Sequence, residues 1–353
     1  MKAAVVKGKG RIGVEEVPAP QVRPGTLLLK TTYCSICGSD LEYLSGAFNR
    51  FMEPLTAGYE LRPGAILGHE YSAKVAAIGE GVAGWSAGDR VAMGSARRTC
   101  GQCYYCRHGL YHLCLGPIAS PRAVPRDVNP YGSADGAMAE YFVRPATALQ
   151  KIPDTVSDEE AAMVEPLSNG VASVENARLK PGDSVAVIGA GKIGLGAMLC
   201  AKAAGSAPVI VIDVRQSRLD IALEMGADAV FNANEVDVVA EVAKMTEAGP
   251  DAVLVCVREG EVLDQAADMV RRGGIVVVTG VVAPSKVNPF LWLMKDLRFA
   301  SHLGGSCITA MRLIAQGKVD IGPVISATMP LTSVQKAFDT MYNGENIAVL
   351  LEP

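Results

Sequence analysis

The sequence is poor in aromatic residues and carries no surplus of positive charge. Phe, Trp and Tyr make up only 5% of the 353 residues, and the formal net charge is -4. A protein that neutralises nucleic-acid phosphates needs an excess of Lys and Arg. We therefore expect no nucleic acid among its partners. The sparse aromatic residues also leave the substrate pocket without a recognisable signature in the sequence.

Long apolar runs are absent as well. No segment reaches the roughly 18 to 20 apolar residues that span a bilayer, and Met1–Val5 lacks the apolar region of a secretory signal. We therefore expect no membrane partner and a cytoplasmic location. Because 353 residues exceed what one hydrophobic core usually serves, two domains are expected.

Cysteine, by contrast, is well represented. The chain has nine, and their odd number and local spacing fit metal ligation in a reducing compartment better than a disulfide framework. Four of them read C-x2-C-x2-C-x7-C, a pattern that can close a tetrahedral cage around one zinc ion without leaving a ligand position for water. Two weaker interpretations are four unrelated thiols and a nucleic-acid zinc ribbon. We predict a structural zinc in a lobe spanning about 94–133, held by Cys100, Cys103, Cys106 and Cys114.

Cys37 is a candidate ligand of a second metal site, and the other four cysteines fall into two pairs. Cys200 and Cys256 lie in apolar stretches and are predicted to be small core residues. For Cys34 and Cys307 the sequence favours neither a core nor a functional role.

The first part of the chain alternates β-forming residues with Gly and Pro breaks, which predicts an irregular, mostly-β domain. A further strand is predicted at 348–351, and we expect it to join this first domain because a terminal strand needs a sheet. The predicted N-terminal strands are 2–6, 26–32, 70–78 and 90–93.

From Pro181 onward, short apolar runs alternate with helical patterns. This alternation predicts an α/β domain built on a doubly wound parallel sheet, whose continuous apolar strands are buried on both faces. The predicted strands are 184–188, 208–213, 229–231, 251–256 and 274–280; the predicted helices are 192–204, 215–225, 236–246 and 262–271, followed by 306–316 and 334–342.

A glycine-rich turn with the pattern G-x-G-x-x-G follows the first of these strands and opens a helix. Gly189 permits a tight turn, Gly191 allows a pyrophosphate to approach the backbone, and Gly194 allows the helix to pack against the strand. Asp213, at the end of the next strand, would accept hydrogen bonds from both ribose hydroxyls and repel a 2′-phosphate. We therefore predict NAD over NADP, a preference that Arg215 and Arg218 weaken. The alternative is a plain strand-helix turn with a surface aspartate.

A second metal site is suggested by Cys37, His69 and Glu165. A catalytic zinc commonly has three protein ligands drawn from Cys, His, Glu and Asp and keeps one exchangeable position. None of the three residues is convincing alone, because an isolated histidine is more often a satisfied core residue.

Together, these segments closely resemble the zinc-containing medium-chain dehydrogenase/reductase family, specifically its polyol and threonine dehydrogenase branch. The resemblance covers nearly the entire chain. It implies a GroES-like, mostly-β catalytic domain at 1–168, a Rossmann NAD-binding domain at 169–305, a return to the catalytic domain at 306–353, and an active site in the cleft between the domains. The motifs that carry it are Cys37–Asp40, Gly68–Glu70, Gly88–Val91, the four-cysteine lobe, Glu165–Leu167 and Gly189–Gly194.

By motif match, the resemblance implies that Cys37, His69 and Glu165 bind the catalytic zinc, and that Glu70 either coordinates it or lies just behind it. Ser39 corresponds to the hydroxyl that relays the substrate proton, and Asp40 to the carboxylate that orients a histidine ligand. Two zinc ions per chain and NAD are the implied cofactors. The expected cofactor-binding residues are Gly189, Gly191, Lys192, Ile193, Gly194, Asp213, Arg218 and Val281.

The chain departs from the family pattern in two places. Many relatives carry a histidine three residues after the relay hydroxyl, where this chain has Glu42, so Glu42, Tyr43 or water could carry the proton to solvent. The stretch 48–63 is also longer than usual, and its residues Phe48, Phe51, Met52 and Tyr59 could form a lid over the substrate.

The expected function is a zinc-dependent oxidoreductase that interconverts a secondary alcohol (a polyol, amino alcohol or cyclic alcohol) and its ketone by hydride transfer to NAD. The alternatives are a carbonyl reductase and an inactive NAD-binding regulatory protein. The resemblance also implies a homo-oligomer, and we favour a tetramer over a dimer. The apolar segments 274–282 and 288–299 are candidates for its interface, although Phe290, Leu291 and Trp292 could instead belong to the core or the substrate pocket.

Overall fold

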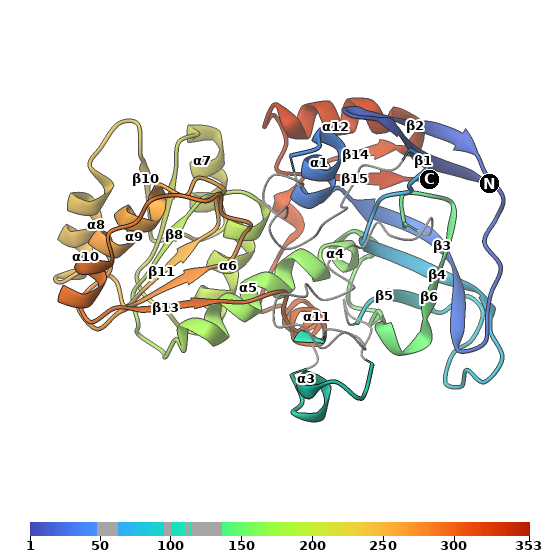
Figure 1. The fold of residues 1–353 in the computed structure, drawn as a ribbon, viewed down its shortest axis with the longest axis horizontal. Coiled ribbons are helices and arrows are strands. Elements are labelled where there is room, and N and C mark those ends of the chain that lie inside the picture. Colours follow the sequence, from blue (N-terminus) through green and yellow to red (C-terminus); the bar gives the residue numbers. More distant parts are fainter. Residues whose placement is uncertain (48–62, 95–99, 111–112, 115–135) are drawn as a thin grey trace. The chain divides into compact units, whose positions relative to one another are not determined.

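The structure, a computed structural model, describes residues 1–47, 63–94, 100–110, 113–114 and 136–353. The chain divides into two compact units (Figure 1). The first consists of Met1–Glu165 with Ile325–Pro353, and the second of Pro166–Val324. The stretch 48–62, which contains the four residues predicted to form a lid, lies outside the described residues.

The first unit is built on a seven-stranded sheet with the order β14-β15-β3-β4-β5-β7, in which β6 also pairs with β3. A separate hairpin of β1 and β2 is joined to the rest by bridges from Ala3 to Ala139 and from Val5 to Ile66. The strands are β1 (Lys2–Gly8), β2 (Arg11–Glu16), β3 (Thr26–Ser35), β4 (Glu70–Ile78), β5 (Arg90–Met93), β6 (Tyr141–Pro145), β7 (Leu149–Lys151), β14 (Ile325–Pro330) and β15 (Ala348–Glu352).

The C-terminal strand joins the N-terminal sheet, as its apolar sequence predicts. In β15, Leu350 and Leu351 are fully buried and pair antiparallel with Ser35 and Cys34 of β3. The helices that accompany this sheet are α1 (Gly38–Ser45), α3 (Tyr104–Arg107), α4 (Asp158–Ala162), the start of α5 (Val164–Ala177) and α12 (Val334–Tyr342).

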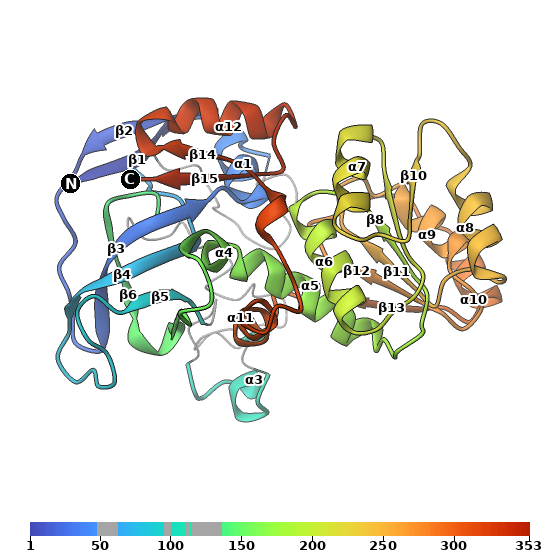
Figure 2. The same cartoon turned by 180° about the vertical axis from the view of Figure 1, so that it is seen from behind.

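The second unit is a doubly wound parallel sheet of six strands in the order β10-β9-β8-β11-β12-β13 (Figure 2). Its central strands are buried along their whole length, which explains their uninterrupted apolar sequences. The strands are β8 (Val185–Ile188), β9 (Val209–Asp213), β10 (Ala229–Asn232), β11 (Ala252–Val255), β12 (Ile275–Val278) and β13 (Arg298–Ser301).

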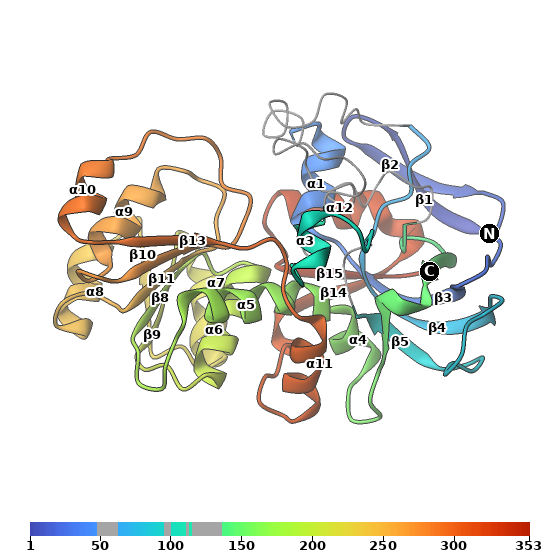
Figure 3. The same cartoon turned by 60° about the horizontal axis from the view of Figure 1, so that its bottom comes forward.

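Helices cover both faces of this sheet. Figure 3 shows α6 and α7 on one face and α9 and α10 on the other. Within the described residues, no helix combines the length and the apolar character needed to cross a bilayer. The helices are α6 (Lys192–Ala203), α7 (Gln216–Glu224), α8 (Val238–Thr246), α9 (Val262–Met269), α10 (Pro289–Met294) and α11 (Cys307–Ala315).

The second unit extends further along the chain than the sequence suggests, because it ends at Val324 instead of residue 305. The segment leading into α11 packs on α5: a Cβ added at Gly305 would lie 1.8 Å from the carbonyl oxygen of Ser168 and 3.0 Å from Cβ of Ala172. This close packing keeps α11 with the parallel sheet. The first boundary lies at Glu165/Pro166, close to the predicted 168/169.

Candidate functional site

The four cysteines of the spacing motif converge as a tetrahedral metal site requires. Their sulfur atoms all lie within 4.8 Å of one another. The Cys100–Cys106 and Cys103–Cys114 sulfur distances are 4.0 and 3.9 Å, close to the edge of about 3.8 Å for a tetrahedron with zinc-sulfur bonds of about 2.3 Å. Backbone N–H groups of Cys100, Cys103 and Cys106 point at neighbouring sulfurs at 3.2 to 3.5 Å. The donor set and its spacing therefore fit zinc.

A second group of potential metal ligands lies where β3 ends and β4 begins. Ser35, the last residue of β3, pairs with Glu70, the first residue of β4. Cys37 and His69 stand just outside this pair, so the strand register brings them to the same end of the sheet. Ligand atoms of Cys37, His69 and Glu70 all lie within 4.8 Å of one another. The sulfur, nitrogen and oxygen donors form a set that zinc accepts.

The backbone at Gly68 shows why the sequence places glycine before the histidine. Gly68 has φ +101, and a Cβ there would lie 2.6 Å from Sγ of Cys34 and 2.8 Å from the backbone nitrogen of Met138. A side chain at this position would push the chain away from Met138. Glycine at 68 therefore allows His69 to stand beside Cys37.

Negative charge gathers around the His69 imidazole. Burial alone lowers the pKa of His69, but Cys37, Asp40 and Glu165 together outweigh burial and raise this pKa well above its usual value. Oδ1 of the fully buried Asp40 lies 3.8 Å from Nδ1 of His69, and Oδ2 of Asp40 accepts the backbone N–H of Cys37 at 2.8 Å. A site with this excess of negative charge favours a divalent cation.

The other predicted residues of this site occupy two helices. Glu165 lies in the first turn of α5; its charge acts on His69, but Glu70 is the carboxylate that groups with Cys37 and His69 within 4.8 Å. Ser39 is half-buried in the first turn of α1, and Glu42 is buried three residues later. Residues three apart on a helix are neighbours on one face, so Glu42 follows Ser39 along that face of α1.

The glycine-rich turn has one glycine that protein packing does not explain. A Cβ at Gly189 would lie 2.5 Å from Cγ1 of Val257, and one at Gly194 would lie 1.7 Å from the Gly189 carbonyl oxygen. At Gly191, however, the nearest atom to an added Cβ is Nη1 of Arg218 at 3.9 Å. Gly191 precedes α6 without a side-chain cap. This open space in front of a helix N-terminus fits a dinucleotide pyrophosphate.

Asp213 already holds the turn together through its carboxylate. Oδ2 accepts the Ala190 N–H at 2.7 Å, and Oδ1 accepts the N–H groups of Val214 and Arg215 at 2.8 and 2.9 Å. A carboxylate offers about four lone-pair positions. The three N–H groups leave about one lone-pair position on the Asp213 carboxylate. Hydrogen bonds from both ribose hydroxyls, as expected from the sequence, would need two.

The remaining predicted cofactor residues surround this turn. Arg218 is half-buried beside Gly191, and its buried Nε has no hydrogen-bond partner among the described residues. Burial lowers the pKa of Arg218, opposed by the nearby Asp213 carboxylate. Lys192 is buried at the first position of α6, Ile193 is half-buried, and Val281 is 45% exposed.

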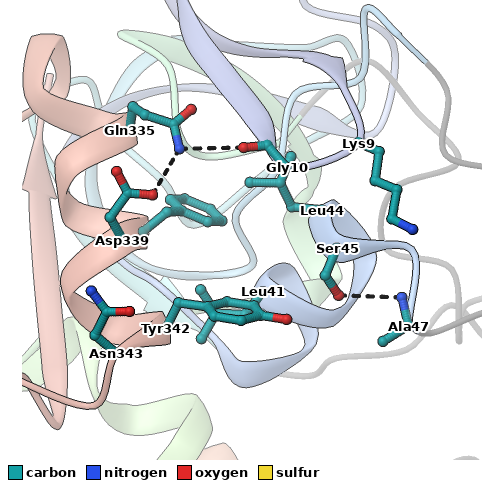
Figure 4. A pocket seen from close by; sticks show the side chains of 11 residues that line it. Lys9, Gly10, Leu41, Leu44, Ser45, Ala47, Gln335, Asp339, Tyr342 and Asn343 are labelled. Atoms are coloured by element: carbon teal, nitrogen blue, oxygen red, sulfur yellow. Dashed lines mark hydrogen bonds between the residues drawn. The ribbon is translucent and has the colours of Figure 1, made fainter.

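A cavity in the first unit lies away from the predicted ligands (Figure 4). It has a volume of about 860 Å³ and is lined mainly by α1 and α12. Leu41, Leu44 and Ser45 of α1 line it, whereas Ser39, Asp40 and Glu42 do not. The predicted proton-relay residues are therefore not part of this cavity.

Sequence reasoning missed a polar group at the carboxyl edge of the parallel sheet. Thr279 and His302 directly follow β12 and β13, and Ser173 of α5 lies within hydrogen-bond distance of both. The sequence carries little signal for this group, because Thr279 falls inside the predicted strand 274–280 and no strand is predicted directly before His302. Cys256, after β11, also lies at this edge; the residue is partly exposed, yet burial raises the pKa of its thiol to about 12, which agrees with its predicted core position. Cys34, Cys200 and Cys307 are buried.

Comparisons with known proteins agree with this geometry. Residues 23–154 match the alcohol dehydrogenase GroES-like domain, and residues 193–316 match the zinc-binding dehydrogenase family. The chain is 31% identical to sorbitol dehydrogenase of Bacillus subtilis, with 100% of this chain and 97% of the relative covered. It is 34% identical to L-threonine 3-dehydrogenase of Pyrococcus horikoshii, with 97% and 96% covered. A zinc-binding dehydrogenase of Sinorhizobium meliloti solved with bound NADP has a TM-score of 0.86 at 29% identity, with 100% and 99% covered.

Proposed function

The chain belongs to the zinc-binding alcohol dehydrogenase family, and we propose on this premise that it oxidises a secondary alcohol of the polyol or amino-alcohol class. It is a zinc-dependent oxidoreductase that uses a nicotinamide dinucleotide. The relatives named for sorbitol and L-threonine support this substrate class. The observation that carries the proposal is the meeting of Cys37, His69 and Glu70, whose ligand atoms all lie within 4.8 Å of one another.

Cys37 and His69 would hold the catalytic zinc together with one carboxylate, that of Glu165 or of Glu70, and the fourth position would be left for the substrate hydroxyl. Zinc in such a site supplies Lewis acidity, which lowers the pKa of a substrate hydroxyl. The Asp40 carboxylate, 3.8 Å from the imidazole, would help to orient it through its charge, and it anchors the backbone at Cys37 through a hydrogen bond. Cys100, Cys103, Cys106 and Cys114 would hold the structural zinc.

Ser39 would accept the proton that leaves the substrate hydroxyl while passing its own proton on. Glu42, next along the same face of α1, is our candidate for the group that receives it. The dinucleotide supplies the hydride acceptor. The turn at Gly189–Gly194 would bind its pyrophosphate, and the carboxylate of Asp213 would favour NAD over NADP because a 2′-phosphate is also negative.

The test is a screen of NADH and NADPH production over polyols, amino alcohols, cyclic alcohols and hydroxyacyl thioesters. We expect activity with one of the first three classes of substrate. The Cys37→Ser variant should lose this activity and also lose one zinc ion per chain. Cys34→Ser is the matched control, because the Cys34 thiol hydrogen-bonds to the neighbouring Ser35 carbonyl at 3.8 Å. Near-normal turnover by Cys37→Ser without the second zinc would overturn the proposal.

We also propose that copies of the chain pair along β13, which ends the strand order of the parallel sheet. An open sheet edge beside apolar side chains is a natural pairing surface. The adjoining helix α10 exposes Phe290, Leu293 and Met294 by 67%, 74% and 54%, whereas Trp292 packs against Phe299 of β13 with ring centroids 4.1 Å apart. We favour a tetramer built partly from this contact.

Sedimentation of Leu293→Asp tests the interface. The added charge should reduce the assembly to smaller species, while Leu223→Asp, at an exposed position of α7, should not. An unchanged assembly in Leu293→Asp would place the interface elsewhere. Finally, we propose a cytoplasmic location, because thiols that bind zinc and form no disulfide are typical of a reducing compartment.

A further inference from the structure

A partly buried polar network connects α5 to the ends of two strands in the second unit. Oγ of Ser173 lies 2.8 Å from the carbonyl oxygen of Asn169, 2.9 Å from Oγ1 of Thr279 and 3.1 Å from Nε2 of His302. Ser173 itself is fully buried. One hydroxyl therefore joins a helix to the residues that directly follow β12 and β13.

The chemistry of these three contacts assigns their protons. A serine hydroxyl has one proton and two lone pairs. The Asn169 carbonyl can only accept, so Ser173 donates its proton there. With that proton used, the other two contacts are satisfied when Thr279 and the Nε2–H group of a neutral His302 donate to the Ser173 oxygen. Burial agrees with a neutral ring, since it lowers the pKa of His302 to about 4.

The network lies at the edge of the sheet where a doubly wound fold binds its ligand. The backbone N–H of Thr279 donates to the carbonyl of Val255, the last residue of β11, at 3.0 Å, and Cβ of the following residue, Cys256, lies 3.5 Å from the Cβ position of Gly194 in the glycine-rich turn. The segments that follow Thr279 and His302 expose Val281 by 45% and Leu303 by 42%. The network thus supports two segments with partly exposed apolar side chains beside the dinucleotide turn.

We propose that Ser173, Thr279 and His302 are positioning residues for the nicotinamide half of the cofactor. They hold the segments after β12 and β13 in the arrangement that receives the ring, and Ser173 ties both segments to α5. The adenosine and pyrophosphate groups depend instead on Gly191, Asp213 and Arg218. The inference rests on the proposed function only in requiring that a dinucleotide binds at this edge, whichever alcohol is the substrate.

The test compares two ligands, NADH and ADP-ribose, which lacks the nicotinamide ring. Ser173→Ala and His302→Leu should each weaken NADH binding by about tenfold, as expected for the loss of one or more buried hydrogen bonds. Their affinity for ADP-ribose should change less than about twofold, which also shows that the second unit is folded. His302→Gln should recover part of the NADH affinity, because its amide N–H can replace Nε2–H.

Ser206→Ala is the matched control, because Ser206 is a buried serine near the start of β9, at the opposite edge of the sheet. Equal weakening of both ligands in Ser173→Ala and His302→Leu would show a general structural role and overturn the proposal. Unchanged NADH affinity would also overturn it. Binding is measured without an alcohol, so an error in the substrate class leaves the result intact.

Discussion

The Oδ1 atom of Asp40 lies 3.8 Å from Nδ1 of His69, and the other oxygen of the same carboxylate accepts the backbone N–H of Cys37. Asp40 therefore supports two proposed zinc ligands at once. Replacing it removes charge from the site and loosens both partners.

Asp40→Asn should lower the affinity for one of the two zinc ions by about 10- to 100-fold, the usual cost of losing a residue that orients a metal ligand. Competition with a chromophoric chelator measures this change. Asp154→Asn, at an exposed position, is the control. Zinc affinity equal to that of the unaltered chain would contradict the assigned role of Asp40.

Cys106→Ala should reduce the zinc content from two ions to one and lower the melting temperature, because a zinc ion bound by the four cysteines would stabilise the fold around them. Cys106 is buried, and its sulfur lies 4.0 Å from that of Cys100. Metal analysis and a thermal scan provide the measurements. Two zinc ions retained after the substitution would show that this cluster is not a zinc site.

Asp213→Asn should reduce the ratio of kcat/KM for NAD to that for NADP by about tenfold. It should also destabilise the turn by about 1 to 3 kcal/mol, because an amide N–H in place of an oxygen leaves one buried backbone N–H without its acceptor. Kinetics with both cofactors and urea unfolding separate the two effects. Asp220→Asn, in the exposed part of α7, serves as the control. Activity with NADP alone in the unaltered chain would refute the assigned role of Asp213.

Glu42→Gln should lower kcat by about 100-fold, as expected for the loss of a group that transfers a proton. The side chain is 6% exposed, so water replaces it poorly. Glu42→His, which introduces an imidazole that can also transfer a proton, should recover much of the rate with a changed pH profile. If Glu42→Gln is as active as the unaltered chain, proton exit uses Tyr43 or water.

His302 should make folding stability depend on pH. Its pKa is lowered from 6.5 to about 4, chiefly by burial, so the unfolded chain binds a proton before the folded chain does. The part of the free energy of unfolding that depends on neutral His302 is fully present above about pH 6.5. It declines as the pH falls and levels off below about pH 4, with a total loss of up to roughly 3 kcal/mol.

Urea unfolding at pH 7.5 and 4.5 measures this dependence. The loss of stability between the two values should be smaller in His302→Gln than in the unaltered chain, and the difference isolates His302 from the zinc ligands that also titrate. Equal losses of stability in the two proteins would show that protonating His302 does not destabilise the folded chain.

Local sequence patterns predicted much of the architecture because their causes are local. The apolar runs of the parallel strands follow from burial on both faces, and the four-cysteine spacing lies within one short loop. The close packing of Gly305 against Ser168 could not be anticipated, because it joins segments far apart in the chain. The end of the second unit was therefore predicted too early.

The order of residues specifies the kinds of chemistry available: thiols spaced for zinc, a glycine turn open to a pyrophosphate, and candidate ligands in separate segments. Which of these groups meet depends on the folded arrangement of the strands and helices. The β3/β4 register brings Cys37 beside His69 and Glu70, and the parallel order of β12 and β13 brings Thr279 and His302 to one hydroxyl of α5. Strand pairing and helix packing are non-local, so no spacing along the chain specifies them.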